Sequence, residues 1–544
     1  MSVECPVPGE LPGDEVVDSR ADGGITAGGA DGKDGARSAT AGSRKTSLSS
    51  RGARALVPFS PYINAVNKAK EEPYSEKSPD GYFLMAQAET VLTFDLIHEK
   101  IKSCREVPST IGLYGNFRGG QRLRQAIATM MQRTFMGVDV DPLHICISSG
   151  VTAVLDLFFF ATCSAGEGCF IRAPYFPAFD NDMSIRNEVV PIPIQPRDTR
   201  SYIPTTLEME DAFTAAQARG IRPRVLLLTN PGNPLGTLYP EATLKELLLW
   251  AINHELHVLS DEIYANSKFG SSASEFVSIE KVAGHLVAEG RLPQALREER
   301  VHTAYGMSKD FGMNGFRVGC LHTKNKDLLA FWQNIGMFAA VSNDTQHALS
   351  VMLEDDKFVD SYVSENKRRL KMSYDLLTSA FEAAGMQYQP ACAAMFCWLD
   401  LRAVLSHPTF EAERLLWREI LDSCKIVITP GEACHYGEPG FFRVCYAAMS
   451  PDQLSVACAR LAAFWKKKVA ERAADGQGGN GQEENGPGVA GQAENGQGGV
   501  AEGNGESEEG EEKQGEGGEK GQGAVGGEGS LSRKRKAEDD PGDA

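Results

Sequence analysis

The fold is decided by the stretch RVLLLTNPGNPLG, residues 224–236, in which an aliphatic run stops at a cluster of proline and glycine. A short apolar run bounded by turn residues is typical of a buried strand, so we predict a strand at 224–229. A helical segment at 241–254 and the strand-like run HVLSDEIY (257–264) follow it. Another short strand, VHTAYGMSK, ends at Lys309. Strands that alternate with helices indicate a parallel or mixed sheet.

The same alternation continues toward the N-terminus. The run RLRQAIATMMQRTF (122–135) predicts a helix, HICIS (144–148) predicts a strand, and SGVTA is a tight turn into a long apolar helix. A strand near 169–172 stops at Pro174, which cannot donate to a sheet ladder. We therefore predict an α/β fold with a mostly parallel central sheet covered by helices on both faces.

The pattern changes after about residue 325, where helices dominate. A helix is predicted at 361–385, strands at 396–401 and 441–447, and an amphipathic helix from Pro451 to about Ala470. These elements predict a second, smaller α+β domain. The predicted parts are a disordered N-terminal segment (1–54), a first piece of the small domain (55–110), the large domain (111–324), the rest of the small domain (325–472) and a disordered acidic tail (473–544).

Composition separates the ends of the chain from its middle. The 544 residues are 42% hydrophobic and 24% charged, as in an ordinary globular protein. Both ends are poor in apolar residues and cannot bury enough surface to offset the entropy of ordering. The net charge of −18 argues against a nucleic-acid partner for the main body. The run RKRK at 533–536 is either a solvated charge cluster or a nuclear-import signal.

Targeting and metal signals are weak. No apolar run is long enough to span a bilayer, and the first residues lack the basic and apolar blocks of a signal peptide. The twelve cysteines show no CxxC pair, and Cys434 beside His435 does not make a metal site. We expect reduced cysteines, no membrane association, no metal and a cytoplasmic location.

Polar motifs follow four of the predicted strands: SGVT, NPGNPLG, DEIY and SK. In sheets of this kind, ligands bind beyond the carboxyl ends of the strands. Each motif alone has a plain structural explanation, because an aspartate can cap a helix and proline with glycine can make a turn. Four of them at successive strand ends predict a binding site.

These residues suit pyridoxal 5′-phosphate, an aldehyde cofactor with a ring nitrogen and a phosphate. Lys309 can form an imine with the aldehyde, and Asp261 can keep the ring nitrogen protonated so that the ring accepts electrons. Tyr264 and Asn233 are available for the ring oxygen.

The phosphate and the substrate need further groups. Val151 and Thr152 begin a helix, whose free N–H groups bind anions, and Arg317 is a fixed cation. Arg443, in EPGFFRVCYA, is the candidate for a bidentate clamp on the carboxylate of an amino-acid substrate. Alone, either arginine would be explained as a surface or ion-paired residue.

Four motifs carry a resemblance to a known family: TNPGNPLGT (229–237), SDEIYA (260–265), SKDFGMNGFRVG (308–319) and GEPGFFRVCYA (437–447). They resemble class I/II aminotransferases of fold type I, in the branch that includes 1-aminocyclopropane-1-carboxylate synthases. The resemblance implies that Lys309 is the Schiff-base lysine and that Asp261, Asn233, Tyr264, Arg317 and Arg443 have the roles given above. It also implies an aromatic stacked on the cofactor at Phe176, a substrate-side glutamate at Glu89, and a homodimer in which Tyr114 reaches the partner's phosphate.

The chain departs from the family pattern at three places. The serine that the family often has three residues before its lysine is Gly306 here, and Ser308 is the hydroxyl left to compensate. The stretch GNFRGGQRLR after Tyr114 follows the synthase pattern only roughly. The family's LAEN segment is QAET (87–90), which keeps the glutamate but changes its neighbours.

Three functions fit these residues. The first is transamination of an α-amino acid, which needs least beyond the groups already found. The second is a lyase that forms the cyclopropane from S-adenosylmethionine or cleaves C–S bonds. The third is a binding or regulatory protein that has lost activity, although the retained lysine, aspartate and arginines argue against it.

Overall fold

The structure is a computed structural model that describes residues 46–56, 62–106, 108–198, 202–271 and 274–478. The RKRK cluster, the acidic tail beyond 478 and residues 1–45 lie outside the described residues. Within the predicted N-terminal disordered segment, residues Ser50–Arg54 form a short helix, α1. Ser49 caps α1 through its side chain, which accepts from the N–H of Gly52 at 3.2 Å. The last residues of the segment predicted to be disordered are therefore helical in the structure.

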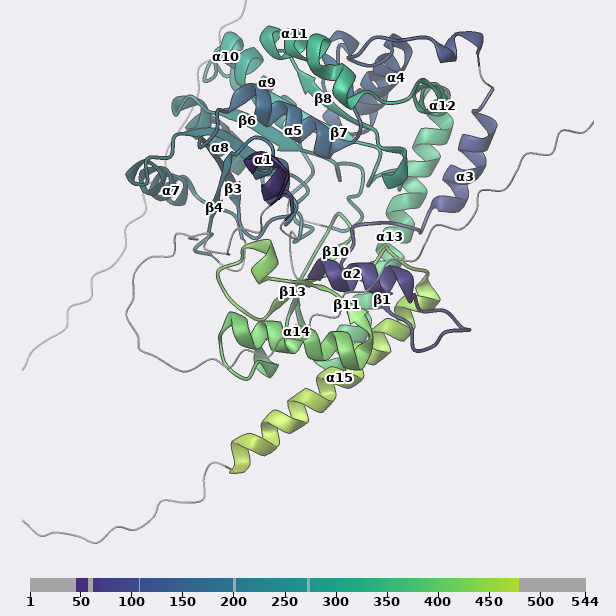
Figure 1. Ribbon diagram of the computed structural model, residues 1–544, viewed down its shortest axis with the longest axis vertical. Helices are drawn as coiled ribbons and strands as arrows, with labels where there is room; N and C mark the ends of the chain where they lie inside the picture. The colour runs from purple at the N-terminus through teal and green to yellow at the C-terminus, as the bar shows by residue number, and fades with distance from the viewer. Residues whose placement is uncertain (1–45, 57–61, 107, 199–201, 272–273, 479–544) are drawn as a thin grey trace, which may run out of the picture. The chain divides into compact units, whose positions relative to one another are not determined.

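A seven-stranded sheet forms the large domain (Figure 1). Its strands are β2 (Ile145–Ser148), β3 (Gly168–Arg172), β4 (Val190–Ile194), β5 (Pro223–Thr229), β6 (His257–Asp261), β7 (Val301–Gly306) and β8 (Gly319–Thr323). Their order is β2-β8-β7-β6-β5-β3-β4, and β8 runs in the opposite direction to the other six strands. The predicted mostly parallel sheet is confirmed. β4 and β8 were not predicted; β4 has the sequence VPIPI, and its two prolines are tolerated because it lies at the sheet edge.

Both faces of this sheet are buried, as the apolar strands predicted. Along β5, Val225 and Leu227 belong to the core under α5 (Val151–Thr162), whereas Leu226 and Leu228 face α8 (Glu241–Asn253) and α9 (Ile279–Ala288). This follows from the alternation of side chains along a strand. The remaining helices of this part are α4 (Gln121–Met131), α6 (Phe179–Ser184), α7 (Thr206–Ala218) and α10 (Gln294–Arg300).

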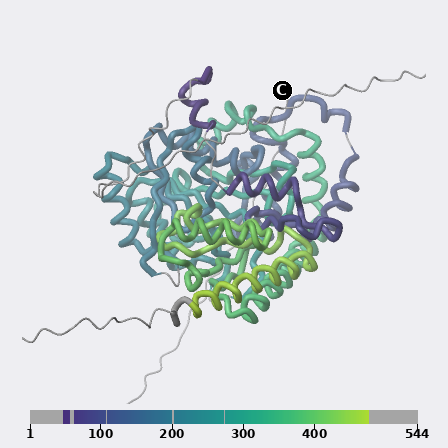
Figure 2. Tube along the Cα trace, turned by 60° about the horizontal axis from the view of Figure 1, so that its bottom comes forward, coloured from purple at the N-terminus to yellow at the C-terminus, as the bar shows by residue number. Residues whose placement is uncertain are grey.

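The small domain combines both ends of the described chain. Its antiparallel sheet has the order β12-β13-β10-β9, from β9 (Gln387–Gln389), β10 (Phe396–Asp400), β12 (Thr429–Pro430) and β13 (Phe441–Cys445). A separate parallel pair joins β1 (Phe83–Leu84) to β11 (Ile426–Val427). Its helices are α2 (Tyr62–Glu71), α13 (Asp356–Ala384), α14 (Phe410–Cys424) and α15 (Pro451–Gly478). α2 packs against β1 and β11, and β11 contacts α14, so the two ends of the described chain share one domain (Figure 2).

Three helices connect the large domain to the small one. α12 (Asn343–Leu353) packs against both α4 and α3 (Phe94–Ser103), and α11 (Lys326–Ile335) precedes it (Figure 1). The residues just after 324 therefore lie with the large domain, and the long helix α13 carries the chain into the small one. α15 also continues past the predicted end at 470.

Among the described residues, no helix is long and apolar enough to cross a membrane. Within the same ranges, no group of histidine, cysteine and acidic side chains could hold a metal ion. Of the eleven described cysteines, all but Cys163 are buried.

Candidate functional site

A cavity of about 370 Å³ lies where β5, β6 and β7 end and α5 begins. Ten of the predicted site residues line it, from six separate stretches of the chain: Glu89, Val151, Thr152, Phe176, Asn233, Asp261, Tyr264, Ser308, Lys309 and Arg317. The parallel strands bring their carboxyl ends to one edge of the sheet, which is why motifs far apart in sequence meet here. Arg443 lies beside the cavity, and Tyr114 lies away from it.

Lys309 follows β7 and extends into the cavity. Its Nζ donates to the carbonyl oxygen of Ala88 at 2.6 Å. Burial lowers the pKa of Lys309 from 10.5 to about 8, and the nearby positive charge of Arg443 acts in the same direction. A substantial fraction of the amine is therefore neutral near physiological pH, as a nucleophile or a general base requires.

Asp261, the last residue of β6, is the acidic group of the cavity. Burial raises the pKa of Asp261 to about 7, while the N–H of Ile263 and the charge of Lys309 oppose that rise. The Ile263 N–H donates to Asp261 Oδ1 at 3.2 Å and fixes the carboxyl group. A cationic group placed next to this carboxyl would favour its ionised form, so Asp261 suits a protonated ring nitrogen.

Tyr264 and Asn233 line the same cavity but differ in their partners. The hydroxyl of Tyr264 is buried and has no hydrogen-bond partner among the described residues. Asn233 Oδ1 accepts from Arg443 Nη1 at 2.9 Å. A buried phenol without a partner is costly unless a ligand supplies one. The free Tyr264 hydroxyl is therefore positioned for a ligand oxygen.

The N-terminus of α5 forms the anion-binding end of the cavity. The first residues of a helix, here Val151 and Thr152, have N–H groups without intrahelical acceptors. Gly150 caps the helix with φ of 92°, and a Cβ at this position would collide with the guanidinium of Arg317. Arg317 Nη1 donates to the carbonyl of Asn314 at 2.9 Å, which holds the cation near the helix terminus. This arrangement suits a phosphate.

Gly306 is explained by the packing around it. A Cβ at this position would lie 2.9 Å from Val151 Cγ2 and 2.9 Å from the carbonyl oxygen of Val318. Neither contact leaves room for a serine side chain, so the hydroxyl that the family often has there is replaced by a packed valine. Ser308 lines the cavity and is the remaining serine of this motif.

Arg443, on β13, is 1% exposed and is held on several sides. It donates to Asn233, to the carbonyl oxygen of Ala86 at 2.6 Å and to Thr429 Oγ1 at 3.2 Å. Its guanidinium lies 4.6 Å from the centre of the Phe396 ring. The Nε of Arg443 has no partner in the described part of the chain. A fixed guanidinium with a spare donor suits a carboxylate.

Tyr114 does not contribute to the cavity of its own chain. Its side chain is 98% exposed, and its ring lies 6.4 Å from that of Phe117. The proposal that it acts across a subunit boundary remains a prediction.

Several cavity residues were not predicted. The main ones are Gln87, Asp182 and Asn314. Gln87 Nε2 donates to Glu89 Oε1 at 2.5 Å, and burial raises the pKa of Asp182 to about 8. Asn314 Nδ2 donates to the carbonyl of Ala88 at 3.2 Å. The signal that could have found Gln87 was its place in QAET, where the family has LAEN.

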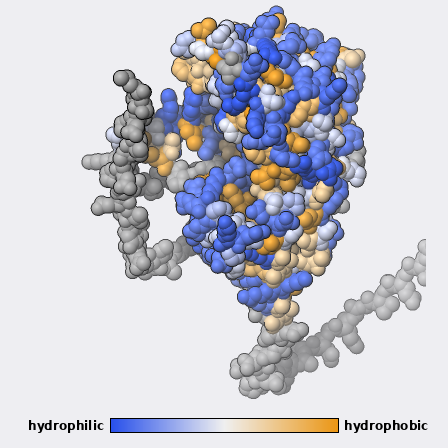
Figure 3. All heavy atoms as spheres, turned by 90° about the vertical axis from the view of Figure 1, so that its right-hand side faces the viewer, coloured by the Kyte–Doolittle hydropathy of each residue, from blue (hydrophilic) through white to orange (hydrophobic). Residues whose placement is uncertain are grey.

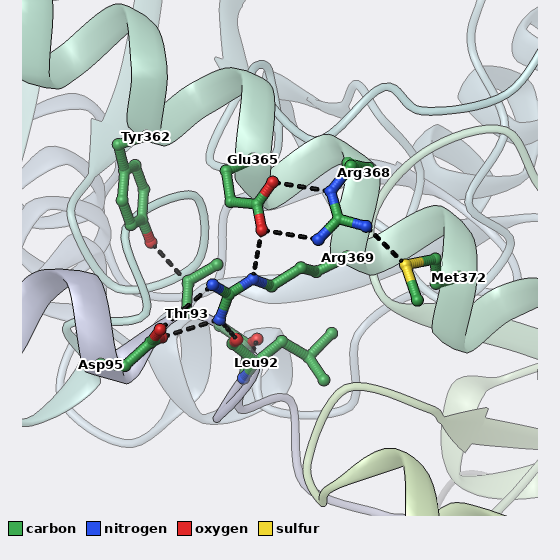
Figure 4. Close-up of polar contacts among 9 residues, drawn as sticks. Leu92, Thr93, Asp95, Tyr362, Glu365, Arg368, Arg369 and Met372 are labelled. Carbon is green, nitrogen blue, oxygen red and sulfur yellow. Dashed lines mark hydrogen bonds and ion pairs between the residues drawn. The ribbon is translucent and has the colours of Figure 1, made fainter.

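A second cavity, of about 910 Å³, contains none of the predicted site residues. It lies between the segment 91–99, α13 and the start of α15, on the face shown in Figure 3, where hydrophobic residues gather across the middle. In its wall, Arg369 donates to Leu92 O at 2.6 Å and to Asp95 Oδ1 at 2.7 Å (Figure 4). Glu365 joins this network through Arg369 and Arg368. The network anchors the segment that follows Glu89 to α13.

Together these groups fit pyridoxal 5′-phosphate. Lys309 offers an amine to an aldehyde, Asp261 a carboxyl to a ring nitrogen, and Tyr264 an unpaired hydroxyl to a ring oxygen. The α5 terminus and Arg317 form a cradle that a side chain at Gly150 would fill.

Comparison with known proteins agrees with this fit. The family model described as "Aminotransferase class I and II" matches residues 87–461. A 1-aminocyclopropane-1-carboxylate synthase of Nicotiana tabacum is 34% identical over 417 residues, which cover 74% of this chain and 83% of the relative. 1-Aminocyclopropane-1-carboxylate synthase 7 of Arabidopsis thaliana is 33% identical over 422 residues, with 75% and 93% covered.

Solved structures share the fold. A single mutant of Thermus thermophilus aspartate aminotransferase superposes with a TM-score of 0.63 at 21% identity, covering 77% of this chain and all of the other. An aromatic aminotransferase from Pyrococcus horikoshii gives 0.60 at 20% identity, covering 75% and 99%.

Proposed function

Because the chain belongs to the class I and II aminotransferase family, which uses pyridoxal 5′-phosphate, we propose that it transaminates an α-amino acid. The observation that carries the proposal is the shared cavity of Lys309 and Asp261, with Arg443 at its side. When bound, the cofactor supplies an aldehyde for the substrate amine and a ring that draws electrons from Cα. The chain's residues supply the binding and the proton transfer.

Lys309 is the proposed base. With its pKa lowered to about 8, the amine of Lys309 can accept the proton from Cα of the substrate and then donate it to a neighbouring atom. The carbonyl of Ala88, 2.6 Å from Nζ, holds that amine at the cavity wall. With the cofactor bound, Asp261 would stabilise positive charge on the ring nitrogen, and the Tyr264 hydroxyl would donate to the ring oxygen.

Arg443 is the proposed clamp for the substrate carboxylate. Its contacts with Asn233, Ala86 and Thr429 fix the guanidinium plane, so little side-chain entropy is lost when a carboxylate binds. Fixing the carboxylate places the Cα–H bond of the substrate with respect to Lys309.

A lyase is the second candidate, and two observations favour it. The relatives at 33–34% identity carry the name 1-aminocyclopropane-1-carboxylate synthase. Glu89 also lines the cavity, where the resemblance implies a substrate-side glutamate. Elimination starts with the same Cα deprotonation and then expels a group from Cβ or Cγ.

We also propose that the protein is a homodimer, as is typical of the family. Leu113 and Tyr114 are 66% and 98% exposed, and Phe338 is 76% exposed. Large exposed apolar side chains of this kind often mark an interface. Light scattering on the purified protein tests the dimer, and a monomer at micromolar concentration would contradict it.

The experiment follows the cofactor absorption of the purified protein. Wild type should be yellow, and Lys309→Ala should lose the lysine-dependent band. Adding an amino acid alone should convert the cofactor to its amine form, and a keto acid should restore it. Release of ammonia, a thiol or methylthioadenosine would instead identify the lyase. Colourless wild-type protein that ignores added cofactor would refute both enzyme functions and favour a binding protein.

A further inference from the structure

We propose that Gln87 and Glu89 together select substrates whose side chain ends in a hydrogen-bond donor, above all a protonated amine. The inference rests on the proposed function, because it concerns the amino acid bound in the same cavity. It assigns a specificity role to Gln87, which is glutamine where the family segment LAEN has leucine.

The two side chains form one unit in the wall of the cavity that contains Lys309. Gln87 Nε2 donates to Glu89 Oε1 at 2.5 Å. An ionised carboxylate can only accept hydrogen bonds, so this contact requires the amide nitrogen to face Glu89. The amide oxygen of Gln87 is therefore turned away from the carboxylate.

That amide oxygen lacks a partner. Gln87 Oε1 is buried and accepts no hydrogen bond from the residues that the structure describes. A buried acceptor without a donor is unfavourable, and a substrate N–H would satisfy it. Alkyl, thioether and sulfonium side chains have no such donor and would leave it unpaired.

Charge adds to this preference. Glu89 brings a carboxylate beside the amide oxygen, so the pair offers two kinds of acceptor and one negative charge. An alkylammonium group has three donors and a positive charge, which matches both features. Arg443 is held by Asn233 and Ala86, and its Nε, which has no partner in the described part of the chain, is left for the substrate carboxylate.

The backbone that carries the pair is held in place. The carbonyl oxygen of Ala88, between the two residues, accepts from both Lys309 and Asn314. Farther along, the N–H of Val91 donates to Ala447 O at 3.0 Å, and Arg369 holds Leu92 (Figure 4). A pair on a fixed backbone can discriminate between side chains because it cannot easily turn aside.

The test compares L-ornithine with L-norleucine, whose side chains have the same number of heavy atoms beyond Cα but end in an ammonium and a methyl group. Each is titrated into the holoenzyme, and binding is read from the change in cofactor absorption. Wild type should bind ornithine at least tenfold more tightly. Gln87→Met keeps the side-chain length without the amide and should reduce the ornithine-to-norleucine ratio at least threefold. Glu89→Gln removes the charge and should reduce it further.

Gln121→Met, an exposed glutamine at the start of α4, is the matched control and should keep the wild-type ratio. Equal binding of the two amino acids by wild type, or an unchanged ratio in Gln87→Met, would overturn the inference alone. Absence of any absorption change with either amino acid would overturn the proposed function, and the inference with it. If Gln87→Met does not retain cofactor, Gln87→Leu makes the same comparison, and the wild-type ratio remains decisive.

Discussion

Replacing Gly306 by alanine should weaken cofactor binding, because the added methyl group has no space. Its Cβ would lie 2.9 Å from Val151 Cγ2 and from Val318 O, well inside the ordinary separation of about 3.5–4.0 Å. Overpacking of this kind costs about 1–3 kcal/mol. Since Val151 belongs to the phosphate end of the cavity, we expect the cofactor dissociation constant to rise by about 5- to 150-fold.

A second substitution identifies the cause. Val151→Ala removes one of the two obstructing groups, so Val151→Ala/Gly306→Ala should bind the cofactor more tightly than Gly306→Ala alone. Recovery should be incomplete because the carbonyl of Val318 is backbone and remains at 2.9 Å. The coupling between the two positions is then obtained from a double-mutant cycle.

The assay is titration of the cofactor-free protein with pyridoxal 5′-phosphate, followed by absorbance. Gly284→Ala, in α9, is the matched control: its nearest contact would be Arg297 Nη2 at 3.7 Å, an ordinary separation. It should bind the cofactor as wild type does. The packing explanation is refuted if Gly306→Ala also binds like wild type, or if adding Val151→Ala gives no recovery.

The pKa of Lys309, lowered to about 8 by burial, predicts that the rate of cofactor binding rises with pH and levels off above about pH 8. Stopped-flow absorbance measures this rate, and a rate that is independent of pH between 6 and 9 would contradict the prediction. The stability of the cofactor-free protein should also rise with pH between about pH 8 and pH 10.5. In that range the unfolded chain binds more protons at Lys309 than the folded protein does. Arg443→Lys should raise the amino-acid concentration needed for half-saturation by about 10- to 100-fold while the cofactor band persists, because one ammonium cannot replace a bidentate guanidinium; unchanged half-saturation would exclude Arg443 as the clamp. Glu280→Gln should lower the free energy of unfolding, measured in a denaturant titration, by about 3–5 kcal/mol. The reason is that this fully buried carboxylate neutralises Arg297 at 3.0 Å and Lys324 at 2.9 Å. A loss below about 1 kcal/mol would show that the ion pairs contribute little to stability.

Local sequence determined the framework of the large domain. The apolar runs that became β5, β6 and β7 end at Asn233, Asp261 and Lys309 or a few residues before them, and helices separate them along the chain. A parallel sheet then follows from the connections, and it necessarily brings the carboxyl ends of these strands to one edge. The motifs at the strand ends were therefore enough to predict that these residues lie near one another, whereas Gln87, Asp182 and Asn314 of the same cavity were not predicted.

Tertiary structure decided the features that depend on contacts between distant residues. The strand β8 and the packing of α11 and α12 with the large domain have no strong local pattern. The glycine at 306 is explained by the carbonyl of Val318 and by Val151, which lies 155 positions earlier, at the start of α5, and packs against it. The Gln87–Glu89 pair is local, but its place in the cavity depends on contacts with Lys309 and Asn314.

The sequence by itself thus determined the order of the elements and the chemistry at the strand ends, because hydrophobic periodicity and turn residues act over a few positions. Only the folded structure decided which side chains fit against one another and which buried polar atoms were left without partners. Those properties depend on differences of a few tenths of an ångström in the distances between segments that are far apart in the chain. No short-range pattern in the sequence encodes them.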